Sequence, residues 1–514
     1  MPTTTRTNRS SAIRFIKWAS GASLLLALCQ LPLGGDPLII LLCLLTEAVC
    51  FVPIYLYGLG RTVGILYIGV WLAFSFSALL AKTLLLQPLD SNLFNPLLAF
   101  CIGLVGSVAF TIAAIAAYYV KPLQKNKIPP VMDPNILSFL AAVFFGIGVV
   151  VFFIAVYARR NSLISNIAVQ FSCYIGFGFV CELASVIIRS NRRHVFSTFS
   201  VIIGISMMYF SISSNSKFGI LSVGLAYILC MTAYRVRFKW PVVIAGVLAL
   251  AFLSEVVFPA IHIVRGYRDR LNPVEVSLAT VQTIGNLLAD DKETVAIKDT
   301  LVQQDAVSAS AGGYQNVYFG SQQVWLDRFT NIGFIDAIAR RFDFNGPFFG
   351  ADSVLSQTMN FLPQKLDPSK NITFRLSAGD RLSQSLGLSA RDQNAYATVT
   401  LPMELFSAGG FSMILAVGVP LIFLMLLEIN FLAFNFSSNV WSVSILLTYG
   451  MMFYASTYDL YIFSEIRQIP TNFVVLTGLI LLAGLMRGSV QWTARSGSAR
   501  SQGRQTGVAV RLGD

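Results

Sequence analysis

Three arginines, Arg265, Arg268 and Arg270, lie within six residues where the chain leaves a long apolar stretch. Guanidinium groups form paired hydrogen bonds with phosphates and carboxylates, so this group beside a tyrosine suits a diphosphate or an acidic sugar. The polar entrance of a loop has a similar composition. Glu255 and His262, which come just before the arginines, favour the interpretation as an anion-binding site.

Two further basic groups lie in short turns between apolar stretches. Arg159 and Arg160 suit an anion contact, and they equally suit side chains that extend their charged ends to lipid phosphates. Lys217 follows small hydroxyl and amide residues at 213–216, which can hold a phosphate or a sugar. A hydrophilic turn with a lysine at the membrane interface has the same pattern. We treat these three cations as candidate substrate-binding residues.

A carboxylate and several polar groups lie between residues 394 and 410. Asn394 and Tyr396 precede Glu404, which stands at the start of an apolar stretch, and the pair Gly409-Gly410 follows. A carboxylate in this position can act as a general base or orient a hydroxyl group. It can equally stabilise the positive end of a helix. The residues alone leave both roles open.

The sequence contains no pattern for a metal or a cofactor. All seven cysteines lie in apolar stretches, and none lies between residues 264 and 399. No CxxC spacing, HExxH motif or glycine-rich nucleotide loop is present. We therefore expect chemistry without a metal and without a cofactor.

The elements that must position these residues are membrane-spanning helices. The chain of 514 residues is 55% hydrophobic and 12% charged, whereas soluble domains contain about 25% charged residues. A span needs roughly 20 apolar residues. We expect an all-α polytopic membrane protein with about twelve transmembrane helices, near residues 16–33, 37–57, 62–86, 96–120, 136–157, 163–188, 195–212, 218–234, 240–262, 404–428, 438–458 and 470–487.

The distribution of Lys and Arg predicts the orientation of these spans. With the N-terminus in the cytoplasm, 19 basic residues flank the spans on the inside and five flank them on the outside in short loops. This asymmetry follows the positive-inside rule. It places both termini in the cytoplasm and residues 264–399 outside. The excess positive charge therefore controls topology. We expect membrane lipids as partners, and we expect no nucleic-acid partner.

Four regions follow from this topology. Residues 1–263 form an N-terminal bundle of about nine helices, and residues 400–490 form about three more. Between them, residues 264–399 are nearly neutral, with 13 Lys or Arg and 14 Asp or Glu. Helical spacing of Ile332, Phe334, Ile335 and Ile338 predicts a mostly helical extracytoplasmic cap, with a turn at Gly346–Gly350. The tail at 491–514 is rich in Ser, Gly and Arg and is expected to be disordered.

The layout resembles the Wzy-type polymerases of O-antigen and exopolysaccharide repeat units and the related O-antigen ligases. Three stretches carry the resemblance. Residues 214–217, Ser-Asn-Ser-Lys, resemble the family's small–Ser–Arg turn. Asp327-Arg328 followed by Pro347–Gly350 resembles an Arg followed by P-x-x-G. Residues 394–396, then Glu404 and the glycine pair, resemble the family's H-N-x-[LY]…E…GG stretch, with Gln393 in place of the histidine.

The resemblance implies an enzyme of the bacterial inner membrane. It implies inverting glycosyl transfer at the periplasmic face, in which a glycan on undecaprenyl diphosphate is moved onto another lipid-linked repeat unit. Glu404, Arg268 and Arg328 are the expected catalytic residues. The expected partners are the lipid-linked oligosaccharide, a chain-length regulator and a flippase of the same pathway.

Three other functions remain open from the sequence. A glycan ligase differs from a polymerase only in its acceptor. A secondary transporter or flippase of lipid-linked glycans shows internal repeats and charged or broken helices at mid-membrane. Glu47 and Glu182 are the mid-span acids of this chain. A non-enzymatic scaffold subunit of an envelope complex is the third alternative.

Overall fold

The computed structural model describes residues 3–120, 131–157, 173–213, 217–237, 240–265, 273–297, 318–319, 330–339, 341–354, 399–455, 458, 461, 474–475 and 477–478. Within these ranges the chain is helical and contains no strand. Seven of its helical stretches are long and apolar enough to cross a membrane. The protein therefore has the fold of a polytopic membrane protein, as the composition predicts.

The first group of helices contains α1 (Thr3–Gln30), α2 (Pro37–Tyr57) and α5 (Pro96–Tyr119). Between α2 and α5 runs a continuous rod of α3 (Thr62–Trp71), the π-helical turn η1 (Leu72–Phe76) and α4 (Ser77–Leu84). The short turn at 31–36 separates α1 from α2 because Asp36 caps α2, accepting a hydrogen bond from Leu38 N at 2.8 Å.

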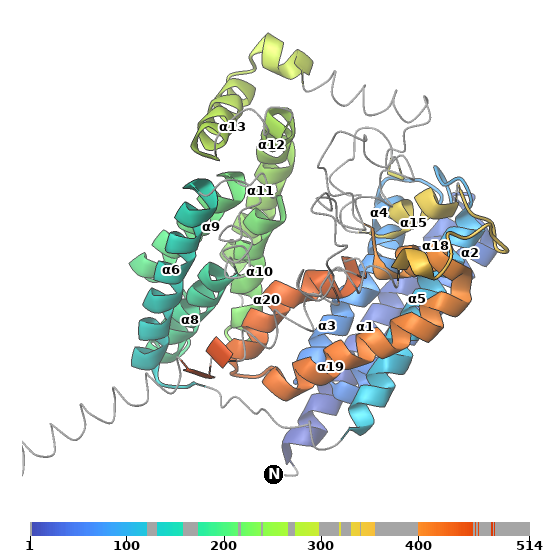
Figure 1. Ribbon diagram of the computed structural model, residues 1–514, viewed down its shortest axis with the longest axis horizontal. Coiled ribbons are helices and arrows are strands. Elements are labelled where there is room, and N and C mark those ends of the chain that lie inside the picture. The colour runs from blue at the N-terminus through green and yellow to red at the C-terminus, as the bar shows by residue number, and fades with distance from the viewer. Residues whose placement is uncertain are drawn as a thin grey trace, which may run out of the picture.

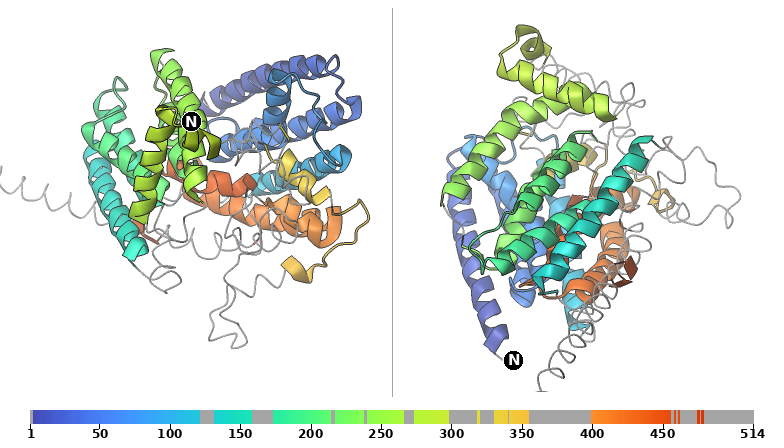
Figure 2. Two further views of the ribbon diagram at one scale, coloured as in Figure 1. Left: turned by 90° about the horizontal axis from the view of Figure 1, so that it is seen from above. Right: turned by 90° about the vertical axis from the view of Figure 1, so that its left-hand side faces the viewer.

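A second group of helices follows in the chain. Its members are α6 (Pro134–Tyr157), α8 (Tyr174–Arg189), α9 (Thr198–Ser213), α10 (Lys217–Ala233), α11 (Trp240–Phe252), η3 (Leu253–Val257), α12 (Phe258–Arg265) and α13 (Pro273–Leu288). Figure 1 and the view from above in Figure 2 place α6, α8 and α9 on the opposite side of the molecule from α1 and α2.

The C-terminal helices join the two groups. The rod of α18 (Leu401–Met413), η5 (Ile414–Gly418) and α19 (Val419–Ala433) packs against α5 of the first group. Helix α20 (Val440–Ala455) then lies between the groups in Figure 1 and contacts α3, α8 and α10. The short helix α15 (Ile332–Ala339) packs against α5 and α18.

The hydrogen bonds group the connecting loops at two ends, in the way that the charge pattern predicts. At one end, Phe436 N bonds Gly60 O at 2.9 Å and Ser438 N bonds Ala233 O at 2.9 Å. All of these loops belong to the side predicted to be cytoplasmic. At the other end, called the outer end below, α4 finishes and α5 begins, at residues 85–95. The three loops at 58–61, 234–237 and 434–439 thus meet at one end; the cytoplasmic or outer location of each end stays a prediction.

The predicted spans agree with the helices in most places. Seven coincide with the long apolar stretches, and the spans near 195–212 and 218–234 coincide with the shorter apolar helices α9 and α10. The span near 470–487 lies largely outside the described residues, so the count of twelve stays a prediction. Of the predicted cap, the described parts include the helices α13 and α15.

Candidate functional site

Two segments far apart in the sequence meet at the outer end of the first helix group. The backbone N–H of Phe349 donates a hydrogen bond to Ser407 O at 2.9 Å. The ring of Phe348 packs edge-on against Phe406, with 5.6 Å between the ring centroids. Segment 341–354 is therefore held on the first turns of α18 by both a backbone hydrogen bond and aromatic contacts.

The glycine pair at 409–410 makes this contact possible. Both residues leave helical geometry, and Gly410 has φ of 71°, a conformation that side chains rarely adopt. A Cβ atom at Gly410 would lie 2.9 Å from the Phe348 ring. Gly346 and Gly350, at the ends of the predicted turn, also have positive φ. The glycines thus shape both surfaces of the contact.

Glu404 lies in the first turn of α18 and is 2% exposed. Its Oε2 atom accepts a hydrogen bond from the backbone N–H of Tyr458 at 2.6 Å. The carboxylate therefore connects the start of α18 to the chain beyond α20. Of the roles that the sequence left open, this hydrogen bond supports a structural one at the helix start, because a general base must reach substrate.

Helix α15 begins deep in the first group and runs toward the outer end. Asn331 N donates to the carbonyl oxygen of Ala73 at 2.8 Å. Ala73 lies in the π-helical turn η1, where the interrupted hydrogen-bond pattern leaves carbonyl groups available. Ile332 lies against Gly103 of α5, where a Cβ would be 3.4 Å from its Cδ1. Every residue of α15 is buried.

Asp336 fixes the other end of α15. It is 1% exposed, and its two carboxylate oxygens accept hydrogen bonds from Phe94 N at 2.8 Å and Asn95 N at 2.9 Å. These N–H groups stand at the start of α5, where the helix dipole also favours a negative charge. Asp336 thus joins the predicted cap to the first helix group.

Lys82 is fully buried at the outer end. Its Nζ atom donates to Ser91 O at 2.9 Å, Ser91 Oγ at 2.8 Å and Gln87 Oε1 at 3.1 Å. It also lies 4.2 Å from the centre of the Tyr318 ring, a cation–π contact. Tyr318 in turn donates its hydroxyl to Leu89 O at 2.7 Å. The cation therefore attaches residues 318–319 to the turn between α4 and α5.

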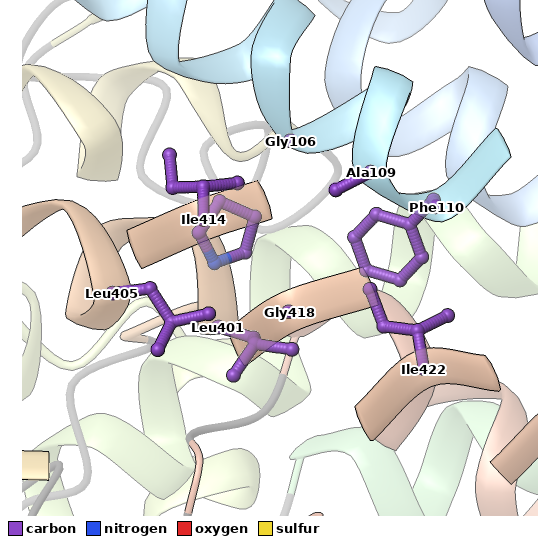
Figure 3. Close-up of a pocket in the computed structure, with 9 residues that line it drawn as sticks. Gly106, Ala109, Phe110, Leu401, Leu405, Ile414, Gly418 and Ile422 are labelled. Atoms are coloured by element: carbon purple, nitrogen blue, oxygen red, sulfur yellow. The ribbon is translucent and has the colours of Figure 1, made fainter. Parts of the chain in front are cut away.

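A small apolar pocket lies beneath Glu404, between α5 and the α18–α19 rod (Figure 3). It is not an enclosed cavity with room for a water molecule, and no polar side chain lines it. It is lined by Gly106, Ala109, Phe110, Leu401, Pro402, Leu405, Ile414, Gly418 and Ile422. This lining therefore offers no group for chemistry and no space for a ligand.

Most of the predicted site residues fall outside the described part of the chain. These are Arg159, Arg160, Arg268, Arg270, Arg328, Asn394 and Tyr396. The backbone places Arg265 at the end of α12 and Lys217 at the start of α10, both in the second helix group. Glu404 lies in α18, beside the first group (Figure 1). The expected convergence of Arg265, Arg268 and Arg328 near Glu404 therefore stays a prediction.

Two buried charges at the outer end were not predicted from the sequence as site residues. Lys82 is one of the five basic residues counted on the predicted outside, although it stands two residues before the end of the apolar rod α3–η1–α4. Asp336 interrupts a stretch in which all the neighbouring residues are apolar. A charge in such surroundings indicates a fixed partner. The partners, Ser91 and the start of α5, come from other elements and were not visible in the local pattern.

Comparisons with family models, curated proteins and solved structures find no match to this chain. Its function is therefore argued from its own residues.

Proposed function

We propose that this protein is a membrane glycosyltransferase. It joins undecaprenyl-diphosphate-linked oligosaccharide repeat units into O-antigen or exopolysaccharide at the periplasmic face of the bacterial inner membrane. One observation carries the proposal: the contact between Phe349 and Ser407 brings Pro347–Gly350 next to Glu404–Gly410. They are the second halves of two of the three stretches on which the resemblance to Wzy-type polymerases rests, and about 50 residues separate them.

The chemistry is an inverting displacement. An acceptor hydroxyl oxygen attacks the anomeric carbon, and the bond from that carbon to the diphosphate oxygen breaks. The hydroxyl proton goes to a base, and the diphosphate leaves with the bonding electron pair. Arg268 and Arg328 stabilise the charge that develops on the diphosphate, which guanidinium groups can do without a metal. Arg159, Arg160, Lys217, Arg265 and Arg270 bind the anionic lipid head, while Asn394 and Tyr396 bind sugar.

Glu404 enters this proposal chiefly as a positioning residue. Its carboxylate is buried and bonded to Tyr458 N. It keeps the start of α18 in place, and with it the surface on which segment 341–354 rests. A role as the base would require the carboxylate to exchange this backbone partner for the acceptor hydroxyl.

The proposal is tested by the length of polymer made in cells and by the purified protein supplied with lipid-linked repeat units. Arg268→Ala and Arg328→Ala are expected to abolish polymer above one repeat unit at unchanged protein level. Arg192→Ala, at an exposed arginine of the opposite end, is the control and should keep normal length. Normal polymer in both the Arg268 and the Arg328 variant rejects the assignment.

A second candidate is a transporter or flippase of lipid-linked glycans. It is favoured by the interrupted rods, which contain the π-helical turns η1, η3 and η5, and by the buried acid Glu47. Proteoliposomes containing fluorescently labelled lipid-linked repeat unit distinguish the two functions. A polymerase lengthens the glycan, whereas a flippase moves it between leaflets without changing its length.

A further inference from the structure

Glu47 lies at the middle of α2, ten residues from each end of the helix. At 1.5 Å per residue this is about 15 Å from either end, close to the centre of a bilayer. The side chain is 2% exposed. An acid at this depth is costly and commonly functional. The proposed glycosyl transfer at the outer end does not use it.

Three donor groups from other elements surround the Glu47 carboxyl. They are the hydroxyls of Ser23 on α1 and Ser75 on η1 and the indole N–H of Trp71 on α3, and all three lie near enough to stabilise the carboxyl. None of them has the geometry of a hydrogen bond. Glu47 Oε1, Ser23 Oγ, Ser75 Oγ and Trp71 Nε1 are all buried without a hydrogen-bond partner among the described residues.

The other mid-span acid shows how a permanently satisfied carboxylate looks in this protein. Glu182 Oε1 accepts from Ser197 Oγ at 2.7 Å, and its Oε2 accepts from Ser138 Oγ at 3.0 Å. Both of its oxygens are thus occupied. Since buried polar groups nearly always have partners, we expect the four atoms of the Glu47 cluster to form hydrogen bonds with one another once the side chains adjust.

The chemistry of the cluster suits the binding of a proton. A neutral carboxyl needs one acceptor for its O–H, which either serine oxygen supplies, while Trp71 N–H donates to the remaining oxygen. An ionised carboxylate needs donors, and the same three groups supply them. Both protonation states can therefore be satisfied by small side-chain movements. The cluster would bind a Na⁺ ion less well than a proton, because the indole N–H cannot act as a metal ligand.

The ionisable groups that interact electrostatically with Glu47 are Cys43 and Cys50, one turn below and one turn above it on α2. Neither is a cation. Within the described residues Glu47 forms no ion pair, so no fixed positive charge holds it ionised. We propose that Glu47, with Ser23, Trp71 and Ser75, is a mid-membrane proton-binding site that gains and loses a proton reversibly.

The site adjoins the turn that holds α15. Trp71 and Ser75 belong to the junction of α3 and η1, and the Ala73 carbonyl of η1 accepts the hydrogen bond from Asn331 N. A change in the hydrogen-bond partner of the Ser75 hydroxyl therefore acts on the same π-helical turn, η1. Protonation of Glu47 is thereby linked to the position of α15 at the outer end. This inference does not rest on the proposed glycosyltransferase activity.

Infrared difference spectroscopy of the purified full chain in lipid nanodiscs tests the proposal. The wild type is expected to show a carboxylic acid C=O band that appears on acidification and disappears on return to high pH. Glu47→Gln removes this band, whereas Glu182→Gln, the matched buried acid, leaves it. Trp71→Phe keeps the band and moves its midpoint upward by about one pH unit, because the ionised form loses a donor.

Each other outcome overturns the proposal. A band that persists in Glu47→Gln belongs to another group, and a band that does not change with pH shows a permanently protonated structural acid. If Glu47→Gln does not fold, Trp71→Phe and Ser75→Ala decide the matter, since an unchanged midpoint in both variants excludes the cluster. If the protection of the α15 amides, after correction for the intrinsic pH dependence of exchange, is the same at low and high pH in the wild type, the link to the outer end is rejected.

Discussion

Glu404 Oε2 lies 2.6 Å from the backbone nitrogen of Tyr458, and both residues are buried. One oxygen atom thus joins the first turn of α18 to the chain after α20. A hydrogen bond to an ionised acceptor is among the stronger ones in proteins. Glu404 therefore helps to set the position of the chain after α20 relative to α18.

Replacement of Glu404 separates its structural role from a catalytic one. Glu404→Ala removes the side-chain oxygen to which the buried Tyr458 N–H donates, and we expect a loss of about 2 kcal/mol of stability. Glu404→Gln keeps an amide oxygen as acceptor and should lose less than half of that. The measurement is thermal unfolding of the purified protein in detergent. A glutamine variant with wild-type stability and no polymerase activity would instead favour the general-base role.

Gly410→Ala should loosen the contact between segment 341–354 and α18. The new Cβ meets the Phe348 ring at 2.9 Å, and alanine disfavours φ of 71°. We expect a cost of about 2 kcal/mol and faster proteolysis of the segment. Gly246→Ala is the matched control, because open space surrounds that helical glycine. Equal proteolysis rates in the two variants would show that the contact is not needed.

Lys82→Met tests the attachment of residues 318–319. Methionine fills similar space but removes the three hydrogen bonds and the cation–π contact with Tyr318. We expect hydrogen exchange at 318–319 to rise by about tenfold or more, from a loss of about 2 kcal/mol. Lys292→Ala removes an exposed lysine of the same predicted loop and should change nothing. Unchanged exchange in Lys82→Met would contradict the attachment.

The predicted orientation can be measured with single cysteines. Asp343→Cys lies at an exposed position beside the outer end, and Arg192→Cys lies at an exposed position of the opposite end. A membrane-impermeant maleimide should label Asp343→Cys in intact spheroplasts, and Arg192→Cys only after permeabilisation. The wild type reports the background from the native cysteines. The reversed pattern would place the termini outside.

The sequence predicts the helices well because each span depends on the hydropathy of its own residues. A run of twenty apolar residues is stable only in a bilayer or in a large protein core. The residues of a turn such as Gly34–Pro37 end a helix through their own backbone preferences. The helix at 332–339 was visible in the spacing of its apolar residues. The burial of that helix between α5 and α18 was not, because its surroundings come from distant parts of the chain.

The candidate site was likewise predictable from the sequence only in part. Pro347–Gly350 and the glycine pair after Glu404 were recognised as motifs, but only folding shows that they touch through Phe349 and Ser407. The charge count assigned Lys82 to the outer side without indicating that it is buried. The number of basic residues in a loop predicts the side of the membrane on which the loop lies. The burial of a single residue depends instead on which other segments of the chain pack over it.

The sequence by itself determined the class of protein, the places of most helices and the sorting of loops between two ends, because hydropathy and charge act through the solvent on each segment separately. The tertiary structure alone decided the roles of individual charges. Glu404 meets a backbone N–H and Glu182 meets two serines, while Glu47 lies among donors that do not yet bond it. Each is a single acid within or at the start of an apolar stretch, and only its distant neighbours show which partner it has.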